Sequence, residues 1–189
     1  MMKKNLISDE EQEIAACMID LGNGKFVRSL SGDQKFRSVI VSVDEQRGIA
    51  LGLCPAFVML PWSFLVLEVN TMDITSGREA TKILLEHAAK KSVELPVAEF
   101  CYNYKGFGVE KGSAFLPSRF ELNSVAAHER GLKTVMRMIG RDNLGCTLWS
   151  SSVNSDCQVW MRDTTGRAVS GWFSQMRTFG VMPMIEIKI

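Results

Sequence analysis

The chain has 189 residues, with 22 Lys and Arg against 21 Asp and Glu, and therefore a formal net charge of +1. Proteins that bind nucleic acid by neutralising phosphates carry a basic excess or a basic stripe, so this balance argues against a nucleic-acid partner. Apolar residues make up 46% and charged residues 23%, which is typical of a globular protein rather than a disordered one. The length fits a single domain, residues 1–189, with residues 1–13 as a short extension.

Neither a membrane span nor a disulfide framework is expected. The most apolar stretch, residues 49–69, contains Pro55 and Pro61 and reads as buried strands separated by a turn. The five cysteines are an odd number and form no CxxC pair, which favours reduced thiols. Residues 1–4 resemble the start of a signal peptide, but acidic residues in 9–13 occupy the place of its apolar segment. We therefore expect no export through a signal peptide.

The first third of the chain predicts strands. Residues 13–21 lead into Gly22-Asn23-Gly24 and then residues 25–27, and the Asn-Gly step supplies the positive φ angles of a tight hairpin. Residues 8–11 also fit a capping box, so a short helix at the start is the alternative. Two further strands, one alternating and one apolar throughout, are expected at residues 36–43 and 49–54.

The middle third predicts helices. Ser76 with Glu79, and Ser118 with Glu121, have the Ser-x-x-Glu spacing of a capping box ahead of periodic apolar residues. Pro96 can begin a short helix that runs to about residue 104. Another periodic stretch, residues 132–139, stops at Gly140, and glycines 106, 108 and 112 mark an irregular loop before the second capping box.

Strands return in the last third. The expected strands are residues 147–150, 158–163, 168–173 and 181–187, with turns at 164–167 and 178–180. Strands, then helices, then strands, without a repeating βα unit, indicate an α+β fold in which two to four helices pack on a mainly antiparallel sheet.

Residues suited to catalysis or metal binding are scattered. His87 and His128 lie on predicted helices among charged residues, which favours a surface position over the role of catalytic base. Neither the cysteines nor the acidic residues have the spacing of a zinc site or a calcium loop. The glycines at 106–112 lack the Gly-Lys-Ser/Thr ending of a phosphate loop. We therefore expect no catalytic residue, no metal and no cofactor.

Three of the four tryptophans, Trp149, Trp160 and Trp172, fall in one stretch rich in small polar residues. Half-buried aromatic rings among such residues make good recognition surfaces, because a rigid ring supplies contact area at low entropic cost. The alternative is that Trp149 and Trp160 belong to the core and only Trp172 is exposed. The sequence leaves both interpretations open.

Several short segments together resemble one family. Residues 114–122, AFLPSRFEL, are similar to the Leu-Pro-Ser-x-x-Glu-Leu segment of bacterial C-type-lectin-like domains. Four later segments are similar, in the same order, to the C-terminal part of that family: Trp149-Ser150-Ser151-Ser152, Val159-Trp160, Gly166 and Gly180-Val181-Met182-Pro183. The family has Arg at the position of Met182. The match covers residues 17–187. It implies a C-type-lectin-like fold, with the final strand near the first.

The resemblance also implies binding rather than catalysis. Family members include surface-display proteins of bacteriophages and gut bacteria, so the expected role is a non-catalytic binding and display protein of a phage virion, made in the host cytoplasm. Its ligand would be a protein or a surface glycan, and homo-oligomeric assembly is expected. The calcium-binding triplets of animal lectins are missing. The expected ligand-binding residues are Asn154, Asp156, Gln158, Arg162, Arg167, Trp172, Gln175 and Arg177.

Two alternatives share this fold. One is a cytoplasmic variable protein of a diversity-generating retroelement, in which the same stretch carries the variable residues. The other is an oxidase of the formylglycine-generating type, which needs a pair of reactive cysteines, with Cys146 and Cys157 as candidates. For self-assembly, we expect Phe173, Phe179 and Met184 to supply an exposed apolar patch.

Overall fold

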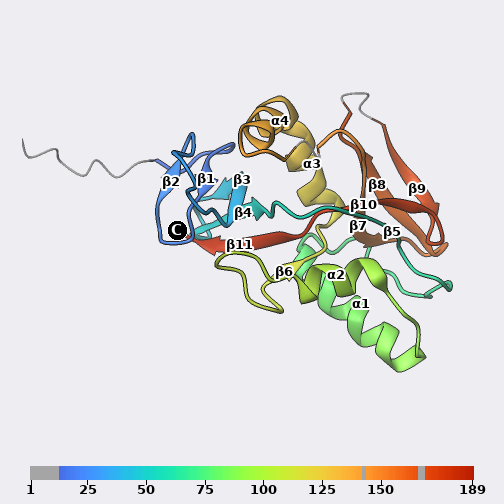
Figure 1. The fold of residues 1–189 in the computed structure, drawn as a ribbon. Coiled ribbons are helices and arrows are strands. Elements are labelled where there is room, and N and C mark those ends of the chain that lie inside the picture. Colours follow the sequence, from blue (N-terminus) through green and yellow to red (C-terminus); the bar gives the residue numbers. More distant parts are fainter. Residues whose placement is uncertain (1–12, 142–143, 166–168) are drawn as a thin grey trace, which may run out of the picture.

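The computed structural model describes residues 13–141, 144–165 and 169–189. Two sheets and four helices make up the described fold, which confirms the α+β class (Figure 1). The helices are α1 (Gly77–Lys91), α2 (Pro96–Asn103), α3 (Arg119–Ala127) and α4 (Glu129–Met138). No helix in the described part of the chain has the length and apolar character needed to cross a bilayer.

The first sheet has six strands and is antiparallel. Its order is β2 (Phe26–Val27), β1 (Ile19–Asp20), β3 (Ser38–Asp44), β4 (Ile49–Leu53), β11 (Met184–Lys188) and β6 (Ala114–Phe115). The β1–β2 hairpin turns at the predicted Asn-Gly step, although its strands are two residues long. The final strand shares this sheet with β1, but β3 and β4 separate the two.

The second sheet has five strands. Its order is β5 (Val58–Pro61), β10 (Thr178–Val181), β7 (Thr147–Val153), β8 (Gln158–Asp163) and β9 (Ser170–Ser174). Only β10 and β7 run parallel. Two predictions are wrong here: residues 178–180, expected as a turn, belong to β10, and the single strand expected over 181–187 is two strands. The chain leaves the second sheet after Val181 and enters the first at Met184, so Met182-Pro183 joins the sheets.

The capping residues begin the helices where the sequence predicts. The Ser118 hydroxyl accepts from the Glu121 N–H, and the Glu121 carboxylate accepts from the Ser118 N–H at 2.7 Å, which is a complete capping box. Ser76 caps α1 in the same way through the Glu79 N–H. Gly140 follows α4 with a φ of 71°, a conformation that favours glycine.

Apolar side chains cover both faces of the first sheet and the face of the second sheet that carries Trp149. One core packs the first sheet and Leu148 of β7 against α3 and α4, and a second packs Trp149 of β7 against α1 and α2. Successive β7 residues thus serve different cores, as strand alternation requires. The predicted oligomer patch is wrong: Met184 is fully buried, and Phe173 and Phe179 are half-buried and pack edge to face, their centroids 5.7 Å apart.

Candidate functional site: a loop tip at one end of the second sheet

The stretch expected to bind ligand, residues 153–177, does not form one surface. The turns after β7 and after β9 lie at one end of the second sheet, and the β8–β9 connection lies at the other end. Val153 and Met161 from this stretch face the core. The expected residues therefore have to be assigned to separate places.

Gln175 holds the first of these ends together. Its side chain is 1% exposed. Its Oε1 accepts from the Leu67 N–H at 2.7 Å, while its Nε2 donates to the carbonyl oxygens of Leu67 at 2.9 Å and Cys157 at 3.0 Å. One amide thus joins three segments far apart in the sequence. This position does not favour the expected contact of Gln175 with a ligand, because the side chain is buried and its oxygen and both amide hydrogens bond to the backbone.

The segments that Gln175 joins form the loop tip, defined here as residues 63–67, 154–158 and 174–177. Four of its exposed residues are large and apolar: Phe64, Leu65 and Val66 are 55, 61 and 54% exposed, and Met176 is 59% exposed. Three consecutive large apolar side chains in water are costly unless something covers them. Sequence reasoning missed them, because an apolar run reads as a buried strand.

The loop that carries Phe64–Val66 is fixed to its neighbours. The Ser63 N–H donates to the Gln175 carbonyl oxygen at 3.1 Å. The Ser63 hydroxyl lies 2.6 Å from the carbonyl oxygen of Leu65 and 3.1 Å from that of Glu94, in the α1–α2 connection. Trp62, just before the loop, is buried and donates through Nε1 to the Ser150 carbonyl oxygen. The exposed residues therefore stand on a well-anchored frame.

Four expected binding residues lie beside these apolar residues. Asp156, Gln158 and Arg177 are exposed, and the Arg177 guanidinium lies 5.4 Å from the centroid of the Phe173 ring. Asn154 mainly shapes its own turn, because its Oδ1 accepts from the N–H groups of Asp156 and Gln158 at 3.0 and 2.9 Å. The tip thus combines an apolar centre with a polar margin, as interfaces do.

Trp172 and Arg162 lie elsewhere, on the face of β8–β9 that carries Trp160. Trp160 and Trp172 are directly opposite across the two strands, with ring centroids 5.3 Å apart in an edge-to-face arrangement. Both are half-buried, so neither interpretation of these three tryptophans holds in full: of the three, Trp149 is the one that is fully buried. Two nitrogen atoms on this face, Nε of Arg162 and Nε1 of Trp160, are buried and have no hydrogen-bond partner among the described residues. Arg167 lies outside the described residues.

Two of the serines after Trp149 support the backbone. The Ser150 hydroxyl donates to the Trp160 carbonyl oxygen at 2.8 Å. The Ser152 hydroxyl accepts from the Arg119 N–H at 3.0 Å, which ties the start of α3 to the end of β7. Ser151 differs, since its buried hydroxyl finds no partner in the described part of the chain.

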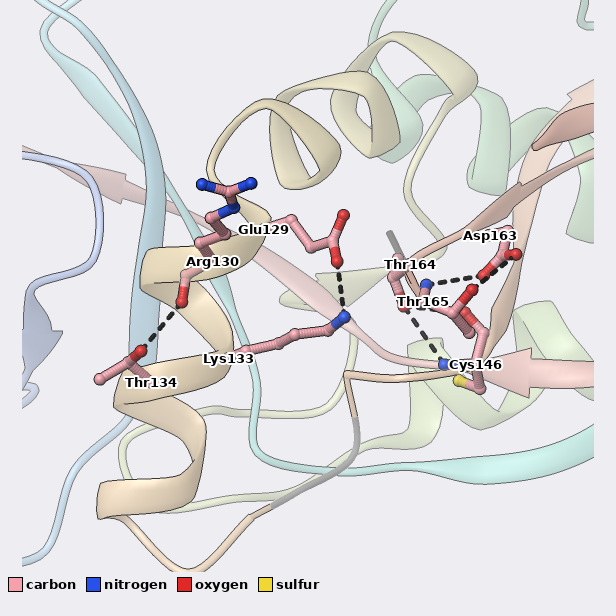
Figure 2. Close-up of polar contacts among 8 residues, drawn as sticks. All are labelled: Glu129, Arg130, Lys133, Thr134, Cys146, Asp163, Thr164 and Thr165. Atoms are coloured by element: carbon pink, nitrogen blue, oxygen red, sulfur yellow. Dashed lines mark hydrogen bonds and ion pairs between the residues drawn. The ribbon is translucent and has the colours of Figure 1, made fainter. Parts of the chain in front are cut away.

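The opposite end of the second sheet closes on itself. The Thr164 hydroxyl donates to the Cys146 carbonyl oxygen at 2.8 Å, and Asp163 accepts from the Thr165 N–H at 2.6 Å. Figure 2 shows this hairpin end beside α4, from which Lys133 and Glu129 extend as an ion pair with N and O 2.5 Å apart. The polar groups named here bond to one another, and residues 166–168 of this connection lie outside the described residues.

The candidate oxidase cysteines are far apart. Cys146 immediately precedes the seven-residue strand β7, and Cys157 lies in the turn after it. A strand of that length separates them by about 23 Å, whereas a disulfide needs Cα atoms within about 7 Å. Burial raises the pKa of the Cys146 thiol, with opposing effects from the Gly145 N–H and Lys133. The reactive pair that the oxidase alternative requires is therefore not assembled.

The histidines and acidic residues do not gather into a further site. His87 is half-buried on α1, while exposed His128 has its Nδ1 3.1 Å from the Ser124 carbonyl oxygen. Within residues 13–141, 144–165 and 169–189, no three His, Cys, Asp or Glu side chains lie where they could share a metal ion. A groove of about 1090 Å³ runs along α1 beside β6, and Arg78 within it is ion-paired to Glu186 at 3.0 Å.

Comparison with known proteins adds one finding about the fold. No family model matches the chain, and no curated protein matches its sequence. The chain is similar in structure to a fimbrial protein from Bacteroides ovatus ATCC 8483, with a TM-score of 0.68 and 10% sequence identity. The similarity covers 92% of this chain and 49% of the fimbrial protein, so this chain spans about half the length of its neighbour. At this identity the likeness establishes the fold alone.

Proposed function

We propose that this chain is a non-catalytic binding module that presents the loop tip to a protein or a surface glycan. The observation that carries the proposal is the exposure of Phe64, Leu65 and Val66 on a loop fixed by Gln175. Exposed apolar residues on a rigid frame favour binding, because little conformational entropy is lost when a partner covers them. The exposed polar residues Asp156, Gln158 and Arg177 would then select among partners.

We further propose that the module has a C-type-lectin-like fold and belongs to an extracellular assembly. The capping box that Ser118 forms at the start of α3 supports the resemblance of residues 114–122 to the segment of that family. The final strand lies in the same sheet as the first, which also agrees with that family. The structural likeness to a fimbrial protein supports a display role, and a phage virion is the setting that the sequence motifs favour.

Binding to whole bacterial cells and to arrayed glycans tests the first proposal. The double variant Leu65→Ser with Val66→Ser removes the apolar centre of the tip and should weaken binding at least tenfold, since each side chain contributes about 1–2 kcal/mol on burial. The matched control is Met138→Ser, which removes a side chain that is 57% exposed on α4. Equal binding by both variants would place the ligand site outside the tip.

Mass spectrometry of purified virions and of sheared bacterial appendages tests the setting. Recovery of the chain from virions supports the phage proposal, and recovery from appendages replaces it with a fimbrial one. A reverse-transcriptase gene beside this gene, with a near-copy of the codons for residues 149–182, would instead support the retroelement alternative. Absence from both preparations contradicts the display proposal.

A further inference from the structure

Strand β9 differs from every other sheet edge in the described fold. It is the outermost strand of the second sheet, and no strand pairs with its far side (Figure 1). It has five residues, Ser170-Gly171-Trp172-Phe173-Ser174, without a charge or a proline, and none of the five is fully buried. Sheet edges of this kind readily pair with another strand, and most proteins avoid leaving them open.

The other three edges are protected. β2 and β6 are two residues long, and the Thr81 hydroxyl lies within hydrogen-bond distance of both the N–H and the carbonyl oxygen of Leu116, which follows β6. β5 ends in Pro61, which has no N–H to offer. Short length, occupied backbone groups and proline are the ordinary means of blocking edge pairing. β9 has neither the short length nor the proline, and of its backbone groups that face away from β8 the Ser174 carbonyl oxygen accepts from the Arg177 N–H at 3.2 Å.

The pairing with β8 determines which β9 groups are free. The Asp163 N–H donates to the Val169 carbonyl oxygen at 2.8 Å, so residues 163 and 169 form a hydrogen-bonded pair. In an antiparallel ladder such pairs alternate with non-bonded ones. From the observed register, Gly171 and Phe173 then bond to β8, while the backbone groups of Ser170, Trp172 and Ser174 point away from it. These three residues form the open edge.

The open edge is complementary to itself. If a second copy pairs antiparallel with Trp172 opposite its own equivalent, Ser170 of each copy lies opposite Ser174 of the other. Near the centre of the edge, each outward N–H of one copy then lies opposite a carbonyl oxygen of the other. The same register places Phe173 of each copy opposite Gly171 of the other, beside which that copy's own Phe173 ring also lies, so the two Phe173 rings come close together. Because the net charge of each chain is only +1, electrostatic repulsion between two copies is weak.

We infer that β9 is a self-association edge, through which two copies of this chain form one continuous sheet about a two-fold axis at Trp172. A second copy is the partner that this edge fits, because its outward residues Ser170, Trp172 and Ser174 are arranged symmetrically about Trp172 and end in the same residue type. The inference rests on the edge alone and does not depend on what the loop tip binds. It also assigns Trp172 a place at the interface between copies instead of in the ligand site.

Sedimentation across the micromolar range tests whether the wild type forms the dimer. The expected mass at high concentration is twice the 21.1 kDa of one chain. A mass of one chain at every concentration overturns the inference.

Two double variants then test the register. Ser170→Lys with Ser174→Lys puts Lys opposite Lys at both ends of the edge, which should weaken dimerisation about ten- to thirty-fold. Ser170→Lys with Ser174→Glu puts Lys opposite Glu in the same register and should restore it. Failure of this second variant to dimerise overturns the proposed pairing.

Control measurements separate association from folding. Ser31→Lys adds a lysine in the exposed connection between β2 and β3 of the other sheet, and should leave the dimer intact. All variants should keep the wild-type thermal unfolding profile when measured at concentrations where they are monomeric. A chain that dimerises as described but binds neither cells nor glycans supports this inference and counts only against the proposed ligand site.

Discussion

Gln175 and Glu121 each join segments that are distant in the sequence, one at the loop tip and one between two helices. Gln175 is a neutral amide that both donates and accepts, and it bonds to the backbone of Leu67 and Cys157. Glu121 is a carboxyl that only accepts when ionised, and it receives the N–H groups of Gly77 at 3.0 Å and Ser118 at 2.7 Å. Each side chain therefore matches the backbone groups around it.

The difference between an amide and a carboxylate explains why Gln175 and Glu121 occupy their respective positions. Helix N-termini present only N–H groups and a positive dipole end, so a carboxylate suits the junction of α1 and α3. The loop tip presents an N–H together with carbonyl oxygens, which a carboxylate could not satisfy. Gly77 completes the helix junction, because a Cβ there would collide with the Glu121 carboxylate and the Leu116 carbonyl oxygen.

The largest effect is expected at the helix junction. Glu121→Ala leaves the buried N–H groups of Gly77 and Ser118 without their acceptor and should lower the free energy of unfolding by about 3 kcal/mol. Urea denaturation measures this. The control is Glu79→Ala, which removes an exposed carboxylate from the first turn of α1 and should cost less than about 0.5 kcal/mol. Similar losses for both would mean that Glu121 acts only through the helix dipole.

A smaller loss is expected at the loop tip. Gln175→Ala removes three hydrogen bonds near the surface, where water can replace some of them, and should cost about 2 kcal/mol. Faster hydrogen exchange at the Leu67 amide should accompany the loss. Gln158→Ala at the same end of the sheet should change the stability by less than about 0.5 kcal/mol, because that side chain is exposed. Unchanged exchange at Leu67 in Gln175→Ala would contradict the joining role.

The smallest effect is a dependence on pH that only the helix junction should show. Burial raises the pKa of Glu121 above its ordinary 4.5, and the hydrogen bonds from Ser118 and Gly77 offset part of this rise. An acid with a raised pKa in the fold stabilises it most below the ordinary value, and this contribution is lost as the pH rises through the raised value. The stability of the wild type relative to Glu121→Gln should therefore fall on going from pH 4 towards neutrality.

Hydrogen exchange completes this test. The Gln175 amide does not titrate. The protection of the Leu67 amide against exchange, corrected for intrinsic exchange, should therefore not show the pH dependence expected for Glu121. If the free energy of unfolding of the wild type relative to Glu121→Gln rises with pH instead, the backbone hydrogen bonds lower the pKa of Glu121 by more than burial raises it.

Much of the local structure is predictable from the sequence. The two Ser-x-x-Glu patterns, Pro96 and Gly140 fix the ends of the helices through contacts within a few residues. The Asn-Gly turn and the β-branched run before residue 44 likewise specify β1–β4. These predictions succeed because caps, turns and periodicity depend on neighbours along the chain.

The candidate site is less predictable. Gln175 and Gln158 are the same residue type in similar surroundings, yet one is buried and the other exposed. Phe64, Leu65 and Val66 read as core residues because nothing local shows that the chain turns outward after Trp62. Residues 178–180 read as a turn, although pairing with β5 makes them a strand.

The sequence by itself determined the α+β class and the positions of the helices. It also determined the balanced charge. Only the tertiary structure decided that Gln175 joins three loops, that an apolar centre stands exposed at the tip, and that β9 is left open while other edges are protected. The reason is physical: caps and turns are satisfied within a few residues, whereas burial and strand pairing depend on which distant segments meet.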